Sequence, residues 1–224
     1  MKLIIIRHGL THSNAGYVIQ GDLDSLNAKG LSQAKSVARK LKGEEIDVIF
    51  SSDMRRARQT AREIAKYHDV PVYYARDIRE RHAGALRGKP LELMLDEMRR
   101  SGMPEHKYAP KGGESIAQVQ ARTVRFLRRI YGRYKNKTVL LVTHGHVIRG
   151  IASFYLGLSL ERLMRVPVKN TGVMVIHIDG RSARKVKDEM FVWESGSAQV
   201  ASKQPGHHPA PGGKHRVPGI KHRA

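Results

Sequence analysis

The chain has 224 residues, of which 40% are hydrophobic, and this is typical of one soluble domain with a well-buried core rather than of two domains. Its 41 Lys and Arg residues outnumber its 20 Asp and Glu residues, and the formal charge of +21 favours anionic partners such as phosphorylated metabolites or nucleic acids. The chain has no Cys, which excludes disulfides, catalytic thiolates and zinc-thiolate sites.

Buried strands and amphipathic helices alternate in the first half of the chain. The predicted elements are, in order, a strand at 2–6, a helix at 31–41, a strand at 47–50, a helix at 54–67 and a strand at 70–74. The first strand is an Ile-rich run of the kind found in parallel sheets with both faces covered. Ser51, Ser52 and Asp53 are the expected N-cap residues of the second helix.

The second half continues the alternation and closes on a hairpin. The predicted elements are a helix at 91–100, a loop at 103–113, a long helix from 115, a strand at 138–142, a helix at 147–156 and strands at 172–178 and 184–193. Ser115 and Gln118 have the spacing of a capping box at the start of the long helix. The pattern predicts an α/β fold, a three-layer α/β/α arrangement around a mainly parallel sheet.

The composition changes near residue 195. Residues 195–224 are rich in Gly, Pro and His and contain five basic residues but no acidic one, so we expect a basic disordered tail behind a domain at 1–194. The tail offers a possible contact to nucleic acid, and the last apolar strand a possible homodimer contact. No apolar run approaches the ~18 residues of a membrane helix. We therefore expect a cytoplasmic protein without a membrane partner.

Two histidines follow buried strands at the edge of the sheet where open α/β folds bind ligands. His8 comes directly after the first strand and His144 after the strand at 138–142. Arg7, Arg56 and Glu80 are expected at the same edge. Guanidinium groups bind phosphate oxygens in bidentate fashion, so the set predicts a cradle for a phosphate group. Two further arginines, Arg55 and Arg58, are expected on a solvated surface.

Five segments, in this order, resemble the histidine phosphatase superfamily, in the branch of the phosphoglycerate mutases and their phosphatase relatives. They are residues 7–14 (RHGLTHSN) with 20–22 (QGD), 51–61 (SSDMRRARQTA), 80–88 (ERHAGALRG), 112–115 (GGES) and 142–145 (VTHG). The resemblance implies a phosphoglycerate mutase-like fold and a phosphomonoesterase that forms a phosphohistidine on His8, with no metal and no cofactor. The substrate would be a small phosphorylated molecule.

The resemblance also implies roles for the other residues. Arg7, Arg56 and a protonated His144 would hold the phosphoryl oxygens, and Glu80, with a pKa raised by partial burial, would be the general acid and base. Contacts to substrate or phosphate are expected from a further set: Asn14, Gln20, Gly21, Arg81 and Gly145.

Three alternatives stay open. A 2,3-bisphosphoglycerate-dependent mutase is the first, although Ala83 stands where the mutases have Tyr and the segment before the last catalytic histidine is shorter than theirs. A metallohydrolase would use His8, His144 and Glu80 as zinc ligands, next to arginines that would repel the ion. A nucleic-acid-binding protein on a catalytically silent fold is the third.

Overall fold

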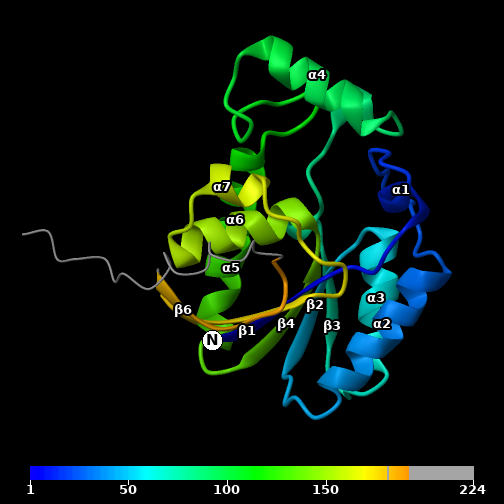
Figure 1. The fold of residues 1–224 in the computed structure, drawn as a ribbon. Coiled ribbons are helices and arrows are strands. Elements are labelled where there is room, and N and C mark those ends of the chain that lie inside the picture. The colour runs from blue at the N-terminus through cyan, green and yellow to red at the C-terminus, as the bar shows by residue number, and fades with distance from the viewer. Residues whose placement is uncertain (181, 192–224) are drawn as a thin grey trace, which may run out of the picture. The chain divides into compact units, whose positions relative to one another are not determined.

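A six-stranded sheet forms the centre of the structure, a computed structural model that describes residues 1–180 and 182–191. The strands are β1 (Lys2–Arg7), β2 (Val48–Ser52), β3 (Val72–Ala75), β4 (Thr138–Thr143), β5 (Val173–Asp179) and β6 (Ser182–Asp188), in the spatial order β3-β2-β4-β1-β5-β6 (Figure 1). The first four of these run parallel, and β5 and β6 are antiparallel additions at one edge. The predicted mainly parallel sheet and its closing hairpin are confirmed, although β6 ends at Asp188.

Helices cover both faces of the sheet. They are α1 (His12–Ala15), α2 (Ala28–Leu41), α3 (Arg55–Ala65), α4 (Leu91–Ser101), α5 (Ile116–Tyr134), α6 (Gly145–Leu156) and α7 (Leu160–Met164). Side chains alternate along β1, so Leu3 and Ile5 join one core with α5 and α6, and Ile4 and Ile6 join the other with α2 and α3 (Figure 1). The α/β/α fold class is therefore confirmed.

Side chains at the helix starts explain two boundaries. Ser115 and Gln118 form both hydrogen bonds of the capping box that the sequence predicts. The expected cap of α3 is wrong: Ser51 and Ser52 continue β2, and Met54 is the N-cap residue, without a side-chain hydrogen bond. The serines remain extended because they pair with β3 and β4 across the sheet.

A small separate core holds α4 at some distance from the sheet, above the carboxyl ends of the parallel strands (Figure 1). It contains the buried residues Ala83, Leu86, Met94 and Tyr108. Gly84 has a φ of +55°, and a Cβ there would lie 2.0 Å from the Lys111 carbonyl oxygen, so only glycine fits where the chain enters this segment. We refer to residues 84–113 as the cap.

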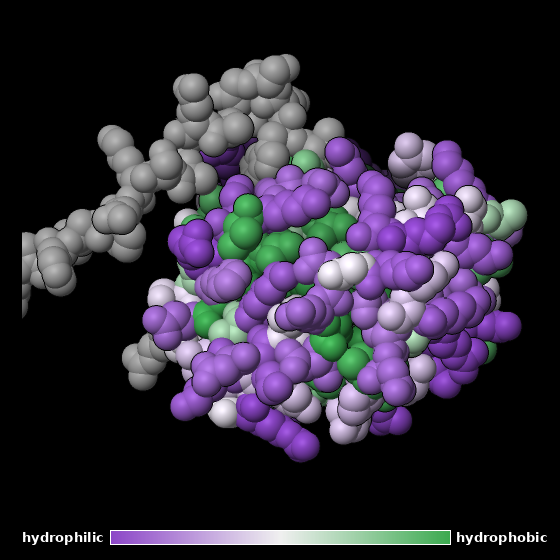
Figure 2. All heavy atoms as spheres, turned by 90° about the horizontal axis from the view of Figure 1, so that it is seen from below, coloured by the Kyte–Doolittle hydropathy of each residue, from purple (hydrophilic) through white to green (hydrophobic). Residues whose placement is uncertain are grey.

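The end of the molecule opposite α4 is largely hydrophilic, with hydrophobic residues visible in small areas between the polar ones (Figure 2). In the part of the chain that the structure describes, every helix is too short or too polar to cross a membrane. The described residues all belong to one compact unit. The predicted tail at 195–224 lies outside the described residues.

Candidate active site

The register of β1 and β4 brings the two predicted histidines together. Arg7 and Thr143 are paired at the ends of these neighbouring parallel strands, and the His8 amide donates a hydrogen bond to the Thr143 carbonyl at 3.0 Å. The imidazole rings of His8 and His144 have centroids 5.0 Å apart, and both residues are fully buried. Their separation of 136 positions in sequence is therefore no obstacle to a shared site.

His8 is held in one tautomer with a free ring nitrogen. Its Nδ1 lies 2.7 Å from the Gly9 carbonyl oxygen, which only accepts, so Nδ1 carries the proton. Nε2 is buried and has no partner, which leaves its lone pair available. Burial, Arg56, His144 and Arg7 all lower the pKa of His8 well below its ordinary value. His8 is therefore neutral at physiological pH, as a nucleophile must be.

The loop around His8 is fixed by its surroundings. The Gly9 amide donates to Thr60 Oγ1 at 3.1 Å, and Asn170 Nδ2 donates to the His8 carbonyl at 2.8 Å. A Cβ on Gly9 would lie 2.4 Å from the Gly30 carbonyl oxygen, so any larger residue would displace this loop.

His144 bonds to a serine at the tip of β2. Its Nε2 lies 2.8 Å from Ser52 Oγ, and the same Oγ accepts the Met54 amide at 3.3 Å. Because Ser52 Oγ already accepts that amide, we assign its hydroxyl proton to the bond with Nε2 and the ring proton of His144 to Nδ1. Burial is the main cause that lowers the pKa of His144 well below its ordinary value, followed by Arg56. In the protein alone His144 is therefore neutral, whereas the sequence analysis expects a protonated ring around the bound phosphoryl group.

Both predicted phosphate-binding arginines are anchored at one end of the guanidinium group. Arg7 Nη1 donates to the Val168 carbonyl, and Arg56 Nη1 donates to the Gly21 carbonyl at 2.7 Å. The Nε atoms of both arginines are buried without a partner. Gly21 therefore acts on Arg56 through its carbonyl oxygen, a positioning contact.

Unpartnered buried atoms concentrate at this place. Among the described residues, eight buried side-chain nitrogen or oxygen atoms lack a hydrogen-bond partner. Five of them belong to predicted site residues: Arg7 Nε, His8 Nε2, Asn14 Oδ1, Arg56 Nε and His144 Nδ1. Because an unmade buried hydrogen bond costs about 1–3 kcal/mol, such a concentration indicates a site built for a polar ligand.

Glu80 faces the same site in a different ionisation state from the expected one. Its Oε1 accepts hydrogen bonds from the Arg81 amide at 3.0 Å, the His146 amide at 3.2 Å and His146 Nδ1 at 3.1 Å. Burial alone would raise the pKa of Glu80, but His146, His144 and the Arg81 amide outweigh it and hold the pKa well below its ordinary value. The expected raised pKa is therefore wrong for the protein alone.

Most of the predicted substrate contacts line one cavity of about 200 Å³ below the cap. Asn14, Gln20 and Gly145 line it together with Glu80. Arg81 also lines it, but its guanidinium group donates to the carbonyls of Glu114, at 2.7 Å, and Tyr108, at 2.9 Å. Its hydrogen bonds therefore anchor the cap, and the geometry does not favour the expected substrate contact.

The sequence reasoning missed Ser52 and Arg149 and gave His146 no definite role. Ser52 lies at a strand tip, on the same edge of the sheet as His8 and His144, and that position was the signal for it. Arg149 lines the cavity from α6, and burial lowers its pKa to about 10. In the sequence, Arg149 follows Gly145 by one helical turn, and nothing in that position indicated that its side chain would line the site.

Over residues 1–180 and 182–191, the structure brings together no group of three or more His, Asp or Glu side chains that would hold a metal ion. The ligand set of the metallohydrolase alternative, with His8, His144 and Glu80, is therefore not assembled.

Comparison with known proteins shows the family of the chain. The family model of the histidine phosphatase superfamily (branch 1) matches residues 3–188. Phosphoserine phosphatase 1 of Hydrogenobacter thermophilus is 34% identical over 186 residues, which are 81% of this chain and 88% of that protein. A metal-independent phosphoserine phosphatase of Arabidopsis thaliana is 35% identical over 190 residues, 79% of this chain and 76% of that protein. The solved structure of YhfR from Bacillus stearothermophilus has a TM-score of 0.75 and 29% identity, and the match covers 82% of this chain and 94% of that one. The chain belongs to the histidine phosphatase superfamily, branch 1.

Proposed function

We propose that the protein hydrolyses small phosphate monoesters through a covalent phosphohistidine on Nε2 of His8. The observation that carries the proposal is the set of buried nitrogen atoms without partners on His8, His144, Arg7 and Arg56. One of these atoms is a nucleophile and three are hydrogen-bond donors, which is what an in-line attack on a phosphoryl group requires.

In the first step, the lone pair of His8 Nε2 attacks phosphorus while the bond to the ester oxygen breaks. The two arginines and the Nδ1–H of His144 donate to the phosphoryl oxygens, whose charge they stabilise in a site shielded from water. Because the pKa of His8 is well below its ordinary value, the ring needs no deprotonation before it reacts. The neutral tautomer of His144 donates without carrying a charge of its own.

The proton for the leaving oxygen is assigned to Glu80. Its carboxyl group is ionised in the protein alone. A bound phosphate dianion next to it would raise its pKa, because a like charge disfavours the ionised form. Protonated Glu80 then gives its proton to the alkoxide. In the second step the carboxylate takes a proton from water, which attacks phosphorus, releases inorganic phosphate and restores His8.

A release assay over a panel of phosphate esters tests this function. The names of the relatives make phosphoserine the first ester to include. The panel is run with and without 2,3-bisphosphoglycerate, which separates a phosphatase from a mutase. Release of phosphate without that addition supports the proposal, and isomerisation without release would replace it with the mutase.

Further expectations from the sequence stay proposals: the boundary between domain and tail at 194–195, a cytoplasmic location, a homodimer, and a contact of the basic tail with nucleic acid.

A further inference from the structure

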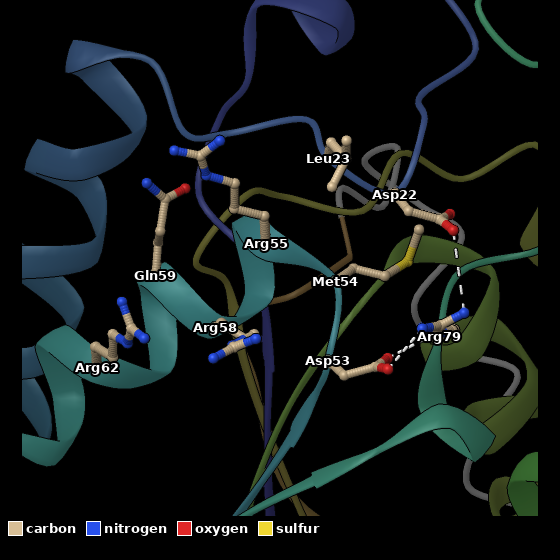
Figure 3. A pocket seen from close by; sticks show the side chains of 9 residues that line it. All are labelled: Asp22, Leu23, Asp53, Met54, Arg55, Arg58, Gln59, Arg62 and Arg79. Carbon is tan, nitrogen blue, oxygen red and sulfur yellow. Dashed lines mark hydrogen bonds and ion pairs between the residues drawn. The ribbon is translucent and has the colours of Figure 1, made fainter.

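A second cavity, of about 560 Å³, lies beside the candidate active site. One wall is α3, from which Arg55, Arg58 and Arg62 project with spacings of three and four residues (Figure 3). Residues at this spacing lie on one helix face. Asp22 and Arg79 line the opposite side. We refer to this cavity as the arginine pocket.

The arginine pocket carries positive charge that no carboxylate balances. Among the described residues, none of the three α3 arginines forms an ion pair, and Arg58 instead lies over the Tyr74 ring at 4.7 Å. The carboxylates of the lining are already paired. Asp53 binds Arg79 at 2.5 Å and 2.6 Å, and Asp22 binds Arg87 at 3.2 Å. The hydrogen bond from Arg79 keeps the pKa of Asp53 below its ordinary value, so that pair persists as ions.

Met54 connects the arginine pocket with the catalytic groups. It lines this pocket and also the neighbouring one that contains Glu80. Its Sδ lies 3.5 Å from Arg56 Nη2 and 3.4 Å from the Glu80 amide nitrogen. Arg55 and Arg56 are consecutive residues on the first turn of α3, and only Arg56 is buried toward the phosphate site. Consecutive residues are about 100° apart around a helix, so Arg55 and Arg56 leave α3 in different directions, one toward each site.

We propose that the arginine pocket binds a second anionic group of the substrate, a phosphate or a carboxylate, on the other side of Met54 from the phosphoryl group that is transferred. This inference rests on the proposed function, and it assigns to that function a class of substrates with two acidic ends. Arginine suits both groups because its planar fork binds their oxygens in pairs. The chain's own segment 195–224 does not complement the pocket, because it contains five basic residues and no acidic one.

Calorimetric titration of the full chain with orthophosphate, tripolyphosphate and a longer linear polyphosphate tests the proposal. Orthophosphate reaches only one site at a time, whereas a long chain would reach both. The double variant Arg55→Gln/Arg62→Gln removes two guanidinium groups from the pocket. The matched control, Lys35→Gln/Arg39→Gln, removes the same charge from the exposed face of the adjacent helix α2.

The long polyphosphate should bind the parent more tightly than orthophosphate does. The α3 double variant should lose about three- to tenfold of that extra affinity, the sum expected for two exposed charge pairs, and the control should lose much less. Equal losses in both double variants, or no loss in either, would overturn the proposal and leave the arginines as solvated surface charges. Calorimetry needs no turnover, so it separates the two proposals. If the parent releases no phosphate from any ester but the α3 double variant still loses affinity for polyphosphate, the proposed phosphatase activity is refuted and the anion-binding role of the arginine pocket stands.

Discussion

Replacing Ser52 with Ala tests how the site holds His144. The change removes the partner of His144 Nε2 at 2.8 Å and of the Met54 amide at 3.3 Å, in a place where Ser52 and His144 are fully buried. An unmade buried hydrogen bond costs about 1–3 kcal/mol. At about 2–4 °C per kcal/mol for a chain of this size, the melting temperature should fall by roughly 2–12 °C.

The turnover number should also fall, because without the hydrogen bond to Ser52 the His144 ring no longer holds Nδ1 toward the phosphoryl group. If the same 1–3 kcal/mol is lost from the transition state, kcat for nitrophenyl phosphate falls by about five- to 160-fold. Ser51→Ala is the matched control: Ser51 is equally buried, and its hydroxyl donates to the Ser52 carbonyl at 2.9 Å, away from the catalytic rings. It should lower the melting temperature but leave kcat near the parent's. Equal losses of kcat in the two variants would refute the assigned role of Ser52.

Three further predictions concern the proton donor, the nucleophile and the cap. Glu80→Gln should slow phosphorylation of the enzyme by alkyl phosphates about 10²–10⁴-fold, but slow it much less with nitrophenyl phosphate, whose leaving group needs no proton. Hydrolysis of the intermediate should then be the slow step and show as a burst of nitrophenol. Equal slowing of phosphorylation by both kinds of ester would exclude Glu80 as the general acid. Because the pKa of His8 is lowered, the profile of kcat/KM for nitrophenyl phosphate against pH should have no midpoint near 6.5, the ordinary pKa of histidine. A midpoint there would contradict a neutral His8. Arg81→Met should loosen the cap and lower stability by about 1.5–3 kcal/mol, the range for hydrogen bonds to a charged group, with little change in orthophosphate inhibition; a large loss of that inhibition would return Arg81 to the phosphate site.

The sequence predicted the elements whose patterns are local. The Ile-rich run of β1 and the capping box of Ser115 are examples. The strand-tip rule also predicted the meeting of His8 and His144, since parallel neighbours end at the same edge. The ionisation of Glu80 could not be predicted from the sequence, because it depends on burial and on contacts between distant residues. His146, which helps to lower the pKa of Glu80, is 66 residues further along the chain.

The same limit explains two other differences. Arg81 has the residue type of a phosphate ligand, but its guanidinium group donates to two carbonyl oxygens, of residue 108 in the cap and of residue 114 directly after it. The serines before α3 have the composition of an N-cap, but pairing with β3 and β4 keeps them in the sheet. In both places a tertiary contact outweighs the local preference of the residue.

Trapping of the phosphoenzyme tests the central claim most directly. The protein is mixed with nitrophenyl phosphate, quenched in alkali to preserve an acid-labile phosphoryl group, and mapped by mass spectrometry, with phosphorus NMR to distinguish the two ring nitrogens. The account predicts a phosphoryl group on Nε2 of His8, and none in His8→Ala. Phosphate on another residue, or turnover by His8→Ala close to that of the parent, would contradict it.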